Sequence, residues 1–560
     1  MPALRTWPRT ARITVVAVVT LMVSVIAAAA ASGADPNEPA ASESSTGTTQ
    51  AEQPNIVYVL TDDMSADLLQ YMAEVDKLKA EGTTMENFVY GDSLCCPSRA
   101  TILTGKFPHN TGVLTNNAQD LDGDGQADGG LKAFRRWENR TIATALQDAG
   151  YRTGMMGKYL NGYKPIGSSS APDLYVPPGW DEWHVAGGGG YNQMRYTMTR
   201  KIDGNKIHET QFEDPVNSGP YLTDVLAYKA ENFIKRSVNR HPDQPFFLKI
   251  SPFAPHSKVG PAPDDPYPFV PAPRDRADPD AGFPGDCGQL DGEQVDCSEV
   301  RAPRGGAFDK AVENGPSWLR DEPLTQAEID KIDQKYLLRV QMMQAVDDLI
   351  GRVRAKLDEF GVAENTYIVF GSDNGFHLGE HRLLVGKGTV FGHDSTVPLT
   401  VVGPDVRADQ TRRQLVQNVD MYRTFLDMAG VQDPRPSNGR SILGLLGGGG
   451  EWQRQAAFLE HTHKDGPVRG DPDAHVLQGN VRPATYTAIR TADEVYAKYH
   501  NGEEEYYDLT EDPNQLVNQA AELTDQRRAL LDGWRKDLAN CGQGPPTLAC
   551  YDASQHPNDR

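Results

Sequence analysis

The chain has 560 residues, of which 38% are hydrophobic and 24% are charged. This length can bury a sizeable core and predicts one large domain with a smaller companion. The formal net charge of -22 argues against nucleic acid and anionic membrane surfaces as partners. Binding of an anionic substrate would therefore require a local cluster of cations.

The N-terminal segment is typical of an export signal. Arg5, Arg9 and Arg12 precede an apolar run, 13–31, that ends in small residues, as in secretory signal peptides. The run approaches membrane-spanning length, so an uncleaved anchor is the alternative. The small residues favour cleavage, and we predict a signal peptide (1–31), a disordered linker rich in Ser, Thr, Ala and Glu (32–53), secretion, and no stable membrane association.

Two apolar, β-branched runs, 55–60 and 367–370, are predicted to form buried parallel strands. Between them, apolar residues over 332–357 recur at helical spacing, and Gly361 ends that helix. Helices alternating with such strands predict an α/β fold with a large, mostly parallel central sheet. The polar residues that follow the two strands are Asp62, Asp63, Asp373 and Asn374. Because ligands bind beyond the carboxyl ends of such strands, these residues are functional candidates.

The pattern changes after a run of four glycines that ends at Gly450. Short strands are predicted near 458–460, 486–490 and 495–499, and a helix near 525–538. We therefore predict a catalytic domain over 54–447 and a smaller C-terminal α+β subdomain over 448–560.

The six cysteines of an exported chain suggest disulfides. Local pairing of Cys287 with Cys297 and of Cys541 with Cys550 is the simplest arrangement. Cys95 and Cys96 are adjacent, and adjacent cysteines reach disulfide geometry only with strain. This pair therefore requires another explanation.

The stretch from Cys95 to Gly105, CCPSRATILTG, contains Cys-x-Pro-Ser-Arg followed by Leu-Thr-Gly. It resembles the signature of the type I, formylglycine-dependent sulfatases, in which the first cysteine becomes formylglycine (3-oxoalanine). The resemblance implies an alkaline-phosphatase-like sulfatase fold and modification of Cys95 by a formylglycine-generating enzyme. The alternative is a buried cysteine before a helix N-terminus, with Pro97 in its first turn.

The resemblance also implies a metal site. It assigns a cation to Asp62, Asp63, Asp373, Asn374 and an oxygen at position 95. Carboxylate and amide oxygens suit Ca2+, which takes six to eight such ligands. Taken singly, an Asp pair after a strand is more often a turn or a helix cap.

The required cations also match family positions: Arg99, Lys158 in Gly-Lys-Tyr-Leu-Asn, His256 in Pro-His-Ser, and Lys387. Ammonium and guanidinium groups suit a sulfuryl group, whose charge spreads over several oxygens. The resemblance implies that Lys158 and Lys387 neutralise these oxygens and that His256 moves a proton. Individually, each could be an ordinary loop residue.

Segments around Cys95, Lys158 and Asp373 are most similar to the N-acetylglucosamine-6-sulfatase and heparan endosulfatase branch. Many sulfatases place a histidine shortly after the active-site lysine, whereas this chain has Leu160 and Asn161. We predict that Asn161 and His377 bind substrate. His377 is a candidate acid for the leaving group, with an ordinary loop histidine as the alternative.

The resemblance therefore implies a secreted, Ca2+-dependent sulfuric ester hydrolase. Its expected substrate is a sulfated carbohydrate, such as a glycosaminoglycan sugar with an N-acetylglucosamine 6-sulfate group. The alternatives are a phosphate or phosphonate ester hydrolase of the same superfamily and a non-catalytic glycan-binding protein.

The acidic segment from Asp120 to Asp128 has the carboxylate spacing of a calcium loop, but Leu131 replaces the terminal Glu. A second, structural Ca2+ and a plain acidic surface loop are both open.

Overall fold

The computed structural model describes residues 53–164, 175–204, 208–212, 220–260, 267–276, 285–463, 483–543 and 549–558. The predicted signal peptide and all of the predicted linker except Gln53 lie outside these residues. No helix in the described part of the chain is long and apolar enough to span a membrane.

A ten-stranded mixed sheet forms the centre of the fold, in the order β13-β2-β12-β11-β1-β8-β4-β5-β6-β7. Its strands are β1 (Asn55–Thr61), β2 (Thr83–Met85), β4 (Arg152–Gly157), β5 (Glu182–Ala186), β6 (Tyr196–Lys201), β7 (His208–Phe212), β8 (Phe246–Ser251), β11 (Thr366–Ser372), β12 (Leu399–Val402) and β13 (Gln410–Arg412). The central strand β1 is fully buried and pairs in parallel with β11 on one side and β8 on the other. Both strands predicted from apolar runs are confirmed, as is the α/β class.

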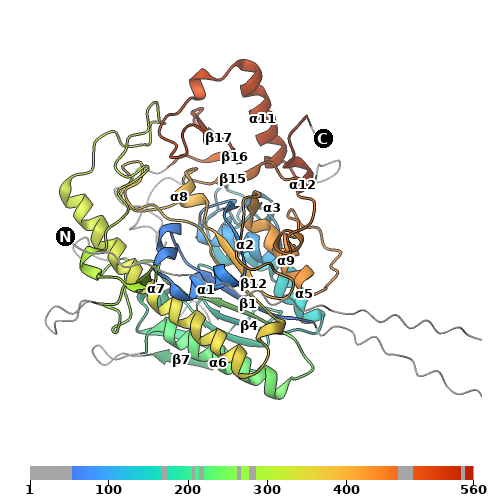
Figure 1. Ribbon diagram of the computed structural model, residues 1–560. Helices are drawn as coiled ribbons and strands as arrows, with labels where there is room; N and C mark the ends of the chain where they lie inside the picture. The colour runs from blue at the N-terminus through green and yellow to red at the C-terminus, as the bar shows by residue number, and fades with distance from the viewer. Residues whose placement is uncertain are drawn as a thin grey trace, which may run out of the picture. The chain divides into compact units, whose positions relative to one another are not determined.

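Helices cover both faces of this sheet (Figure 1). They are α1 (Ala73–Glu81), α2 (Cys95–Thr104), α3 (Pro108–Thr111), α4 (Gly130–Phe134), α5 (Ile142–Asp148), α6 (Leu222–Arg240), α7 (Gln326–Glu359), α8 (Gly392–Ser395), α9 (Met421–Met428) and α10 (Leu443–Leu446). Successive residues of a strand point to opposite faces, so Phe246 of β8 packs on Phe233 of α6 and Phe247 packs on Phe425 of α9. The helices α6 and α7 thus lie on one face, and α9, with α2 and α5 against it, lies on the other.

The long helix predicted over 332–357 is confirmed within α7. It begins in a capping box between Thr325 and Glu328, which satisfies backbone N–H groups at its first turn. It ends just before Gly361, whose φ of 66° is readily adopted by glycine.

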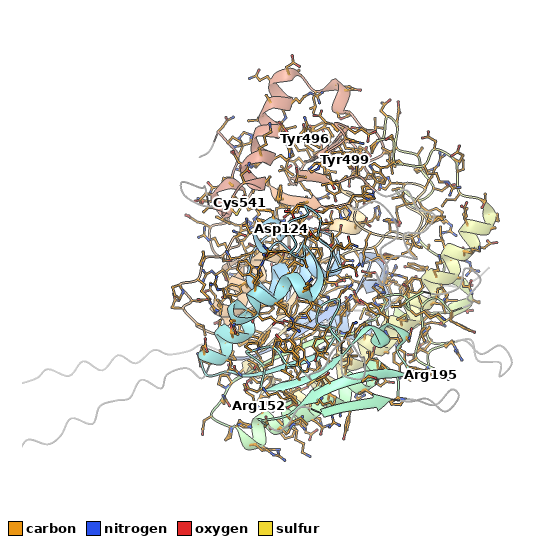
Figure 2. The ribbon with its side chains drawn as sticks, turned by 180° about the vertical axis from the view of Figure 1, so that it is seen from behind. Asp124, Arg152, Arg195, Tyr496, Tyr499 and Cys541 are labelled. Atoms are coloured by element: carbon orange, nitrogen blue, oxygen red, sulfur yellow. A yellow bond between two sulfur atoms is a disulfide. The ribbon has the colours of Figure 1, made fainter. Side chains whose placement is uncertain are left out.

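A second, four-stranded antiparallel sheet consists of β15 (Ala457–His461), β16 (Tyr486–Arg490), β17 (Glu494–Tyr499) and β18 (Glu504–Asp508). Helix α11 (Asp525–Ala539) packs on it, and α12 (Cys550–Ala553) follows. Tyr496 and Tyr499 of β17 lie in this sheet (Figure 2). Three of these strands and α11 were predicted. Two small pairs complete the strands: β3 (Phe88–Val89) with β14 (Val416–Gln417), and β9 (Gln289–Leu290) with β10 (Glu293–Gln294).

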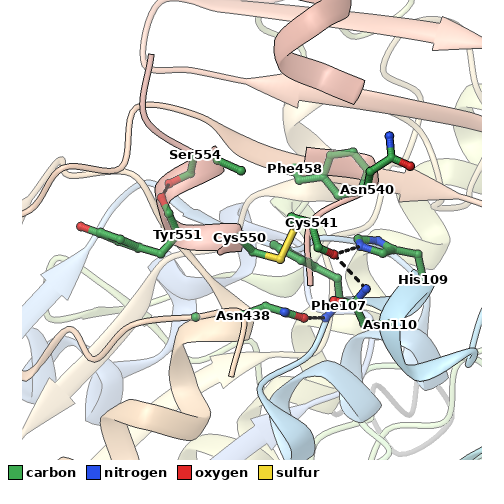
Figure 3. The surroundings of a disulfide bond; sticks show 12 residues. Phe107, His109, Asn110, Asn438, Phe458, Asn540, Cys541, Cys550, Tyr551 and Ser554 are labelled. Atoms are coloured by element: carbon green, nitrogen blue, oxygen red, sulfur yellow. Dashed lines mark hydrogen bonds between the residues drawn. A yellow bond between two sulfur atoms is a disulfide. The ribbon is translucent and has the colours of Figure 1, made fainter. Parts of the chain in front are cut away.

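Both predicted disulfides are present, Cys287–Cys297 and Cys541–Cys550, and Cys95 and Cys96 are free and buried. The second disulfide lies beside the segment that follows α2 (Figure 3). There, the Asn110 side-chain amide donates a hydrogen bond to the Cys541 carbonyl oxygen (3.1 Å). The C-terminal part of the chain thus contacts the segment next to the helix that carries Cys95.

Candidate active site

Two pairs of polar residues meet at one edge of the central sheet. Asp62 and Asp63 follow β1, and Asp373 and Asn374 follow β11, which pairs with β1 through Thr61 and Ser372. The Asp63 backbone N–H donates to Asp373 Oδ1 (3.1 Å), and all four side chains are at most 1% exposed. The two pairs therefore share the edge of the sheet beyond the carboxyl ends of β1 and β11.

Cys95 lies against this group as the first residue of α2. Its Sγ is 3.4 Å from Asp62 Oδ1 and 3.8 Å from Asp63 Oδ1, and Lys387 Nζ is 2.9 Å from the same sulfur. Asp62, Asp63, Cys95 and His256 each offer a potential metal-ligand atom within 4.8 Å of the others. Residues separated by more than 300 positions in the chain, Asp62 and Lys387, thus converge on the Cys95 side chain.

Three buried cations balance the three carboxylates. Arg99 Nε is 2.8 Å from Asp373 Oδ2, Lys158 Nζ is 2.7 Å from both Asp62 oxygens, and Lys387 Nζ contacts Asp63 Oδ1. Burial alone would lower the pKa of Lys158, but the Asp62 carboxylate holds that pKa well above its usual value. Burial alone would raise the pKa of Asp373, but the positive charges of Arg99, Lys158 and Lys387 lower it. Burial raises the pKa of Asp62, even though Lys158 opposes the rise. We call these six acidic and basic side chains the charged cluster.

His256 follows β8 and presents one ring nitrogen to the carboxylates. Its Nδ1 is 2.7 Å from the Ser257 carbonyl oxygen, which can only accept, so Nδ1 carries a proton. Its Nε2 is 3.4 Å from Asp63 Oδ2, and Tyr191 packs on the ring with centroids 4.5 Å apart. Nε2 is therefore the atom that can exchange a proton at the site.

Asn161 and His377 lie beside the charged cluster rather than within it. The Asn161 backbone N–H donates to Cys96 Sγ (3.0 Å), which links the Lys158 loop to α2. His377 Nδ1 is 2.9 Å from the Asp394 carboxylate, so Nδ1 carries the proton and Nε2 is left to act. A backbone bridge between His377 and Gly386 places this histidine next to the Lys387 segment.

Two residues near the site were not singled out from the sequence. Tyr191 contacts both His256 and Lys158, whose Nζ is 5.0 Å from the Tyr191 ring centroid. Asp92 is fully buried three residues before Cys95, and His461 Nδ1 is 3.4 Å from its carboxylate. Burial raises the pKa of Asp92 to about 6. Each of these contacts joins separate segments of the chain, so no local sequence pattern predicts it.

The acidic segment predicted as a possible calcium loop brings Asp120, Asp122 and Asp124 within 4.8 Å of one another (Figure 2 labels Asp124). All three are exposed. Their carboxylates accept hydrogen bonds from backbone N–H groups of the same loop, among them Gly123 N to Asp120 Oδ1 (2.7 Å). Such bonds are typical of turns, and the two alternatives, a plain acidic loop and a second Ca2+ site, both stay open.

The model of the sulfatase family matches residues 54–431. The chain belongs to the sulfatase family. The model of the N-sulphoglucosamine sulphohydrolase C-terminal region matches residues 379–538 of this sulfatase. Membership makes the protein a sulfuric ester hydrolase and confirms the resemblance drawn from the Cys95 segment.

Several proteins of named function are similar in sequence to most of this sulfatase. Human N-acetylglucosamine-6-sulfatase is 32% identical over 88% of the chain and 85% of its own length. The Drosophila melanogaster extracellular sulfatase SULF-1 homolog is 32% identical over 72% of the chain, which spans only 32% of that relative. A solved structure in complex with its substrate D-glucosamine-2-N,6-O-disulfate has a TM-score of 0.60 and 25% identity, and covers 86% of this chain and 98% of its own.

Proposed function

We propose that this sulfatase is exported and removes the 6-O-sulfate of N-acetylglucosamine, using formylglycine at Cys95 and a bound Ca2+. The observation that carries the proposal is the position of Cys95, whose Sγ is surrounded by Asp62, Asp63 and Lys387. The name of the human relative supports the sugar, because its similarity extends over most of both chains. A sulfated carbohydrate is accordingly the proposed partner.

The residues present fit a divalent cation. Three carboxyl groups and an amide meet within the charged cluster and at its edge, and hard cations prefer such oxygen ligands. Asn374 Oδ1 is buried and has no hydrogen-bond donor among the described residues, as expected for an oxygen that serves a metal. Asp62, Asp63, Asp373 and Asn374, with an oxygen at position 95, would hold Ca2+, which would supply positive charge to stabilise developing negative charge.

The state of the Cys95 thiol supports its conversion to formylglycine. Burial raises the pKa of Cys95 well above its usual value, even though Lys158 and Lys387 oppose the rise. The unmodified side chain is thus a neutral thiol and a poor nucleophile. A formylglycine at position 95 would supply instead, as its hydrate, an oxygen nucleophile for sulfur and a second hydroxyl that would allow release of sulfate. A formylglycine-generating enzyme is therefore a proposed partner during maturation.

The remaining side chains have roles that follow from their contacts. Lys158 and Lys387 bind the sulfuryl oxygens, and Arg99 keeps Asp373 ionised and in place. His256 exchanges a proton at Nε2. His377, whose Nδ1–H is held by Asp394, donates a proton from Nε2 to the leaving alcohol in its doubly protonated form. Asn161 binds the sugar.

The decisive experiment is mass spectrometry of the tryptic peptide 80–99 from the protein purified from its natural host. Replacement of the Cys95 thiol by an aldehyde would support the proposal, and the Cys95→Ala variant should then lose all hydrolysis of sulfated sugars. A Cys95 thiol that is intact and alkylates quantitatively in fully active protein would contradict it. Hydrolysis of phosphate esters in preference to sulfate esters would favour the superfamily alternative.

Export is proposed from the sequence pattern of residues 1–31, and the word "extracellular" in the name of the fly relative agrees with it. N-terminal sequencing of protein recovered from the culture medium should begin after residue 31. Recovery only from the membrane fraction, with residues 1–31 intact, would favour the anchor.

A further inference from the structure

A cavity of about 400 Å³ opens beside Lys158. The loop 158–163 after β4 forms one wall, and the loop 186–192 after β5, with the short helix η3 (Gly188–Asn192), forms the other. Phe253 and Val259, from the segment after β8, also line it. We call this cavity the Tyr191 pocket. Since Lys158 belongs both to this pocket and to the charged cluster, the pocket adjoins the proposed reaction centre.

The lining of the Tyr191 pocket is mainly aromatic and glycine. Tyr191 and Phe253 pack edge to face with centroids 4.9 Å apart. A Cβ at Gly190 would lie 2.7 Å from the Phe253 ring, so the absence of a side chain there lets the wall approach the ring closely. Such surfaces favour small apolar groups over charged ones.

One polar group of the lining lacks a partner. Asn161 is 7% exposed, and its Nδ2 forms no hydrogen bond within the described part of the chain. Its Oδ1 is 3.5 Å from the Tyr191 hydroxyl. A buried donor without an acceptor is unfavourable, so a ligand carbonyl oxygen would stabilise Asn161.

Charge sets a second limit on the ligand. Lys158 is the one charged side chain among the described residues that line the pocket, and its Nζ is 2.7 Å from both Asp62 oxygens. A second anionic group of the substrate would therefore lose its hydration on entering the pocket and find no free cation there. Burial of an unpaired charge in this way is unfavourable.

From these observations we propose that the Tyr191 pocket binds the acetamido group of the substrate sugar and selects N-acetylated over N-sulfated glucosamine 6-sulfate. The carbonyl oxygen accepts from Asn161 Nδ2, and the methyl group packs on Tyr191 and Phe253. This inference rests on the proposed function. It also separates this sulfatase from its structural neighbour, whose bound substrate carries sulfate on both N2 and O6.

Binding can be measured without turnover in the Ca2+-loaded Cys95→Ala variant, which leaves the ester intact. Titration calorimetry should show that N-acetylglucosamine 6-sulfate binds about tenfold or more tightly than N-sulfoglucosamine 6-sulfate, a difference typical of one well-placed contact. Adding Asn161→Ala should weaken binding of the N-acetyl ligand about tenfold and reduce the discrimination. The matched control is Asn232→Ala, because Asn232 lies on α6 and its side-chain amide donates to Tyr228 O of the same helix.

A gain-of-function variant tests the charge argument. A Cβ at Gly188 would meet nothing within 4 Å, and Gly188 is exposed on the pocket wall. Gly188→Lys should therefore fold normally and tighten binding of the N-sulfo ligand several-fold, with little gain for the N-acetyl ligand.

Equal or tighter binding of the N-sulfo ligand by the parent protein would overturn the inference, as would an unchanged ligand ratio in Asn161→Ala. Either result leaves the proposed function standing if the Cys95 peptide carries an aldehyde and the natural protein hydrolyses sulfate esters. Conversely, an intact Cys95 thiol would remove the formylglycine mechanism while the binding preference persists.

Discussion

Two groups of aspartates in this sulfatase lie at similar distances from one another but in opposite surroundings, one buried and one exposed. Asp62 and Asp63 are buried, face Lys158 and Lys387, and lie at the end of a central strand. Asp120, Asp122 and Asp124 are exposed and bond the backbone of their own loop. The first group pairs with cations from distant parts of the chain, whereas water and local N–H groups satisfy the second. Sensitivity to substitution should therefore follow burial and not the number of carboxylates.

The largest effect is expected for Asp373→Asn, which removes one charge from the buried group. Activity should fall about 10²–10³-fold or more, as for loss of a preorganised electrostatic contact. The free energy of unfolding should fall by about 3 kcal/mol, because Arg99 then lacks its carboxylate at 2.8 Å. Steady-state kinetics and urea denaturation measure the two effects. Wild-type activity in a folded Asp373→Asn protein would remove Asp373 from the proposed metal site.

Removal of a cation should have a smaller effect on rate. Lys387→Met keeps the length of the side chain but leaves Asp63 and the residue at position 95 without their ammonium partner. We expect kcat/KM for a sulfated sugar to fall about 10²-fold. Lys310→Met is a matched control because Lys310 is exposed. A loss confined to KM would show that Lys387 only binds substrate.

The ion pair of His109 and Glu460 is intermediate in burial between the two groups. His109 Nδ1 and Glu460 Oε1 are 2.8 Å apart, and the side chains are 12% and 11% exposed. Burial alone would lower the pKa of His109, but Glu460 raises it above its ordinary value. A folded-state pKa above that of the unfolded chain means that the pair stabilises the protein fully at acidic pH. This stabilisation is lost as pH rises through the folded-state pKa.

The difference in unfolding free energy between wild type and His109→Gln should consequently shrink as pH increases from 6 to 9. Denaturation of both proteins across this range measures it, and the variant corrects for all other titrating groups. A difference that grows with pH would mean that the histidine is neutral in the folded protein.

The smallest effect is expected when the exposed group is neutralised. The triple variant Asp120→Asn, Asp122→Asn, Asp124→Asn should keep its activity within about twofold and its unfolding free energy within about 0.5 kcal/mol, as usual at exposed positions. A large loss of stability that appears only when Ca2+ is present would instead support a second calcium site.

Local patterns accounted for much of the fold. The apolar run of β1, the periodicity of α7 and the spacing of the four disulfide cysteines could each be read over short stretches. Strand β18 was not predicted because Glu504 and Glu505 interrupt its apolar character, although Glu505 is buried and bonds Tyr499 and Tyr507. Its burial depends on partners in the folded sheet.

The candidate site could be predicted where residues follow strands of known direction, as for Asp63 and Asp373. The contacts of Tyr191 with His256 and of Asp92 with His461 could not, since they arise where separate loops meet. The orientation of His377 by Asp394 is of the same kind. Tertiary contacts, not local composition, decide which polar side chains join a site.

The burial of the Cys95 helix has a consequence for how an active molecule is made. Cys95 is 0% exposed, and every residue of α2 is buried. An enzyme that converts this thiol to an aldehyde needs access to the extended segment, so the proposed conversion must occur while the chain is still unfolded. Modification and folding then compete in time. Chains that fold first would be stable, native in shape and permanently inactive, so the specific activity of a preparation would record which of the two processes was faster.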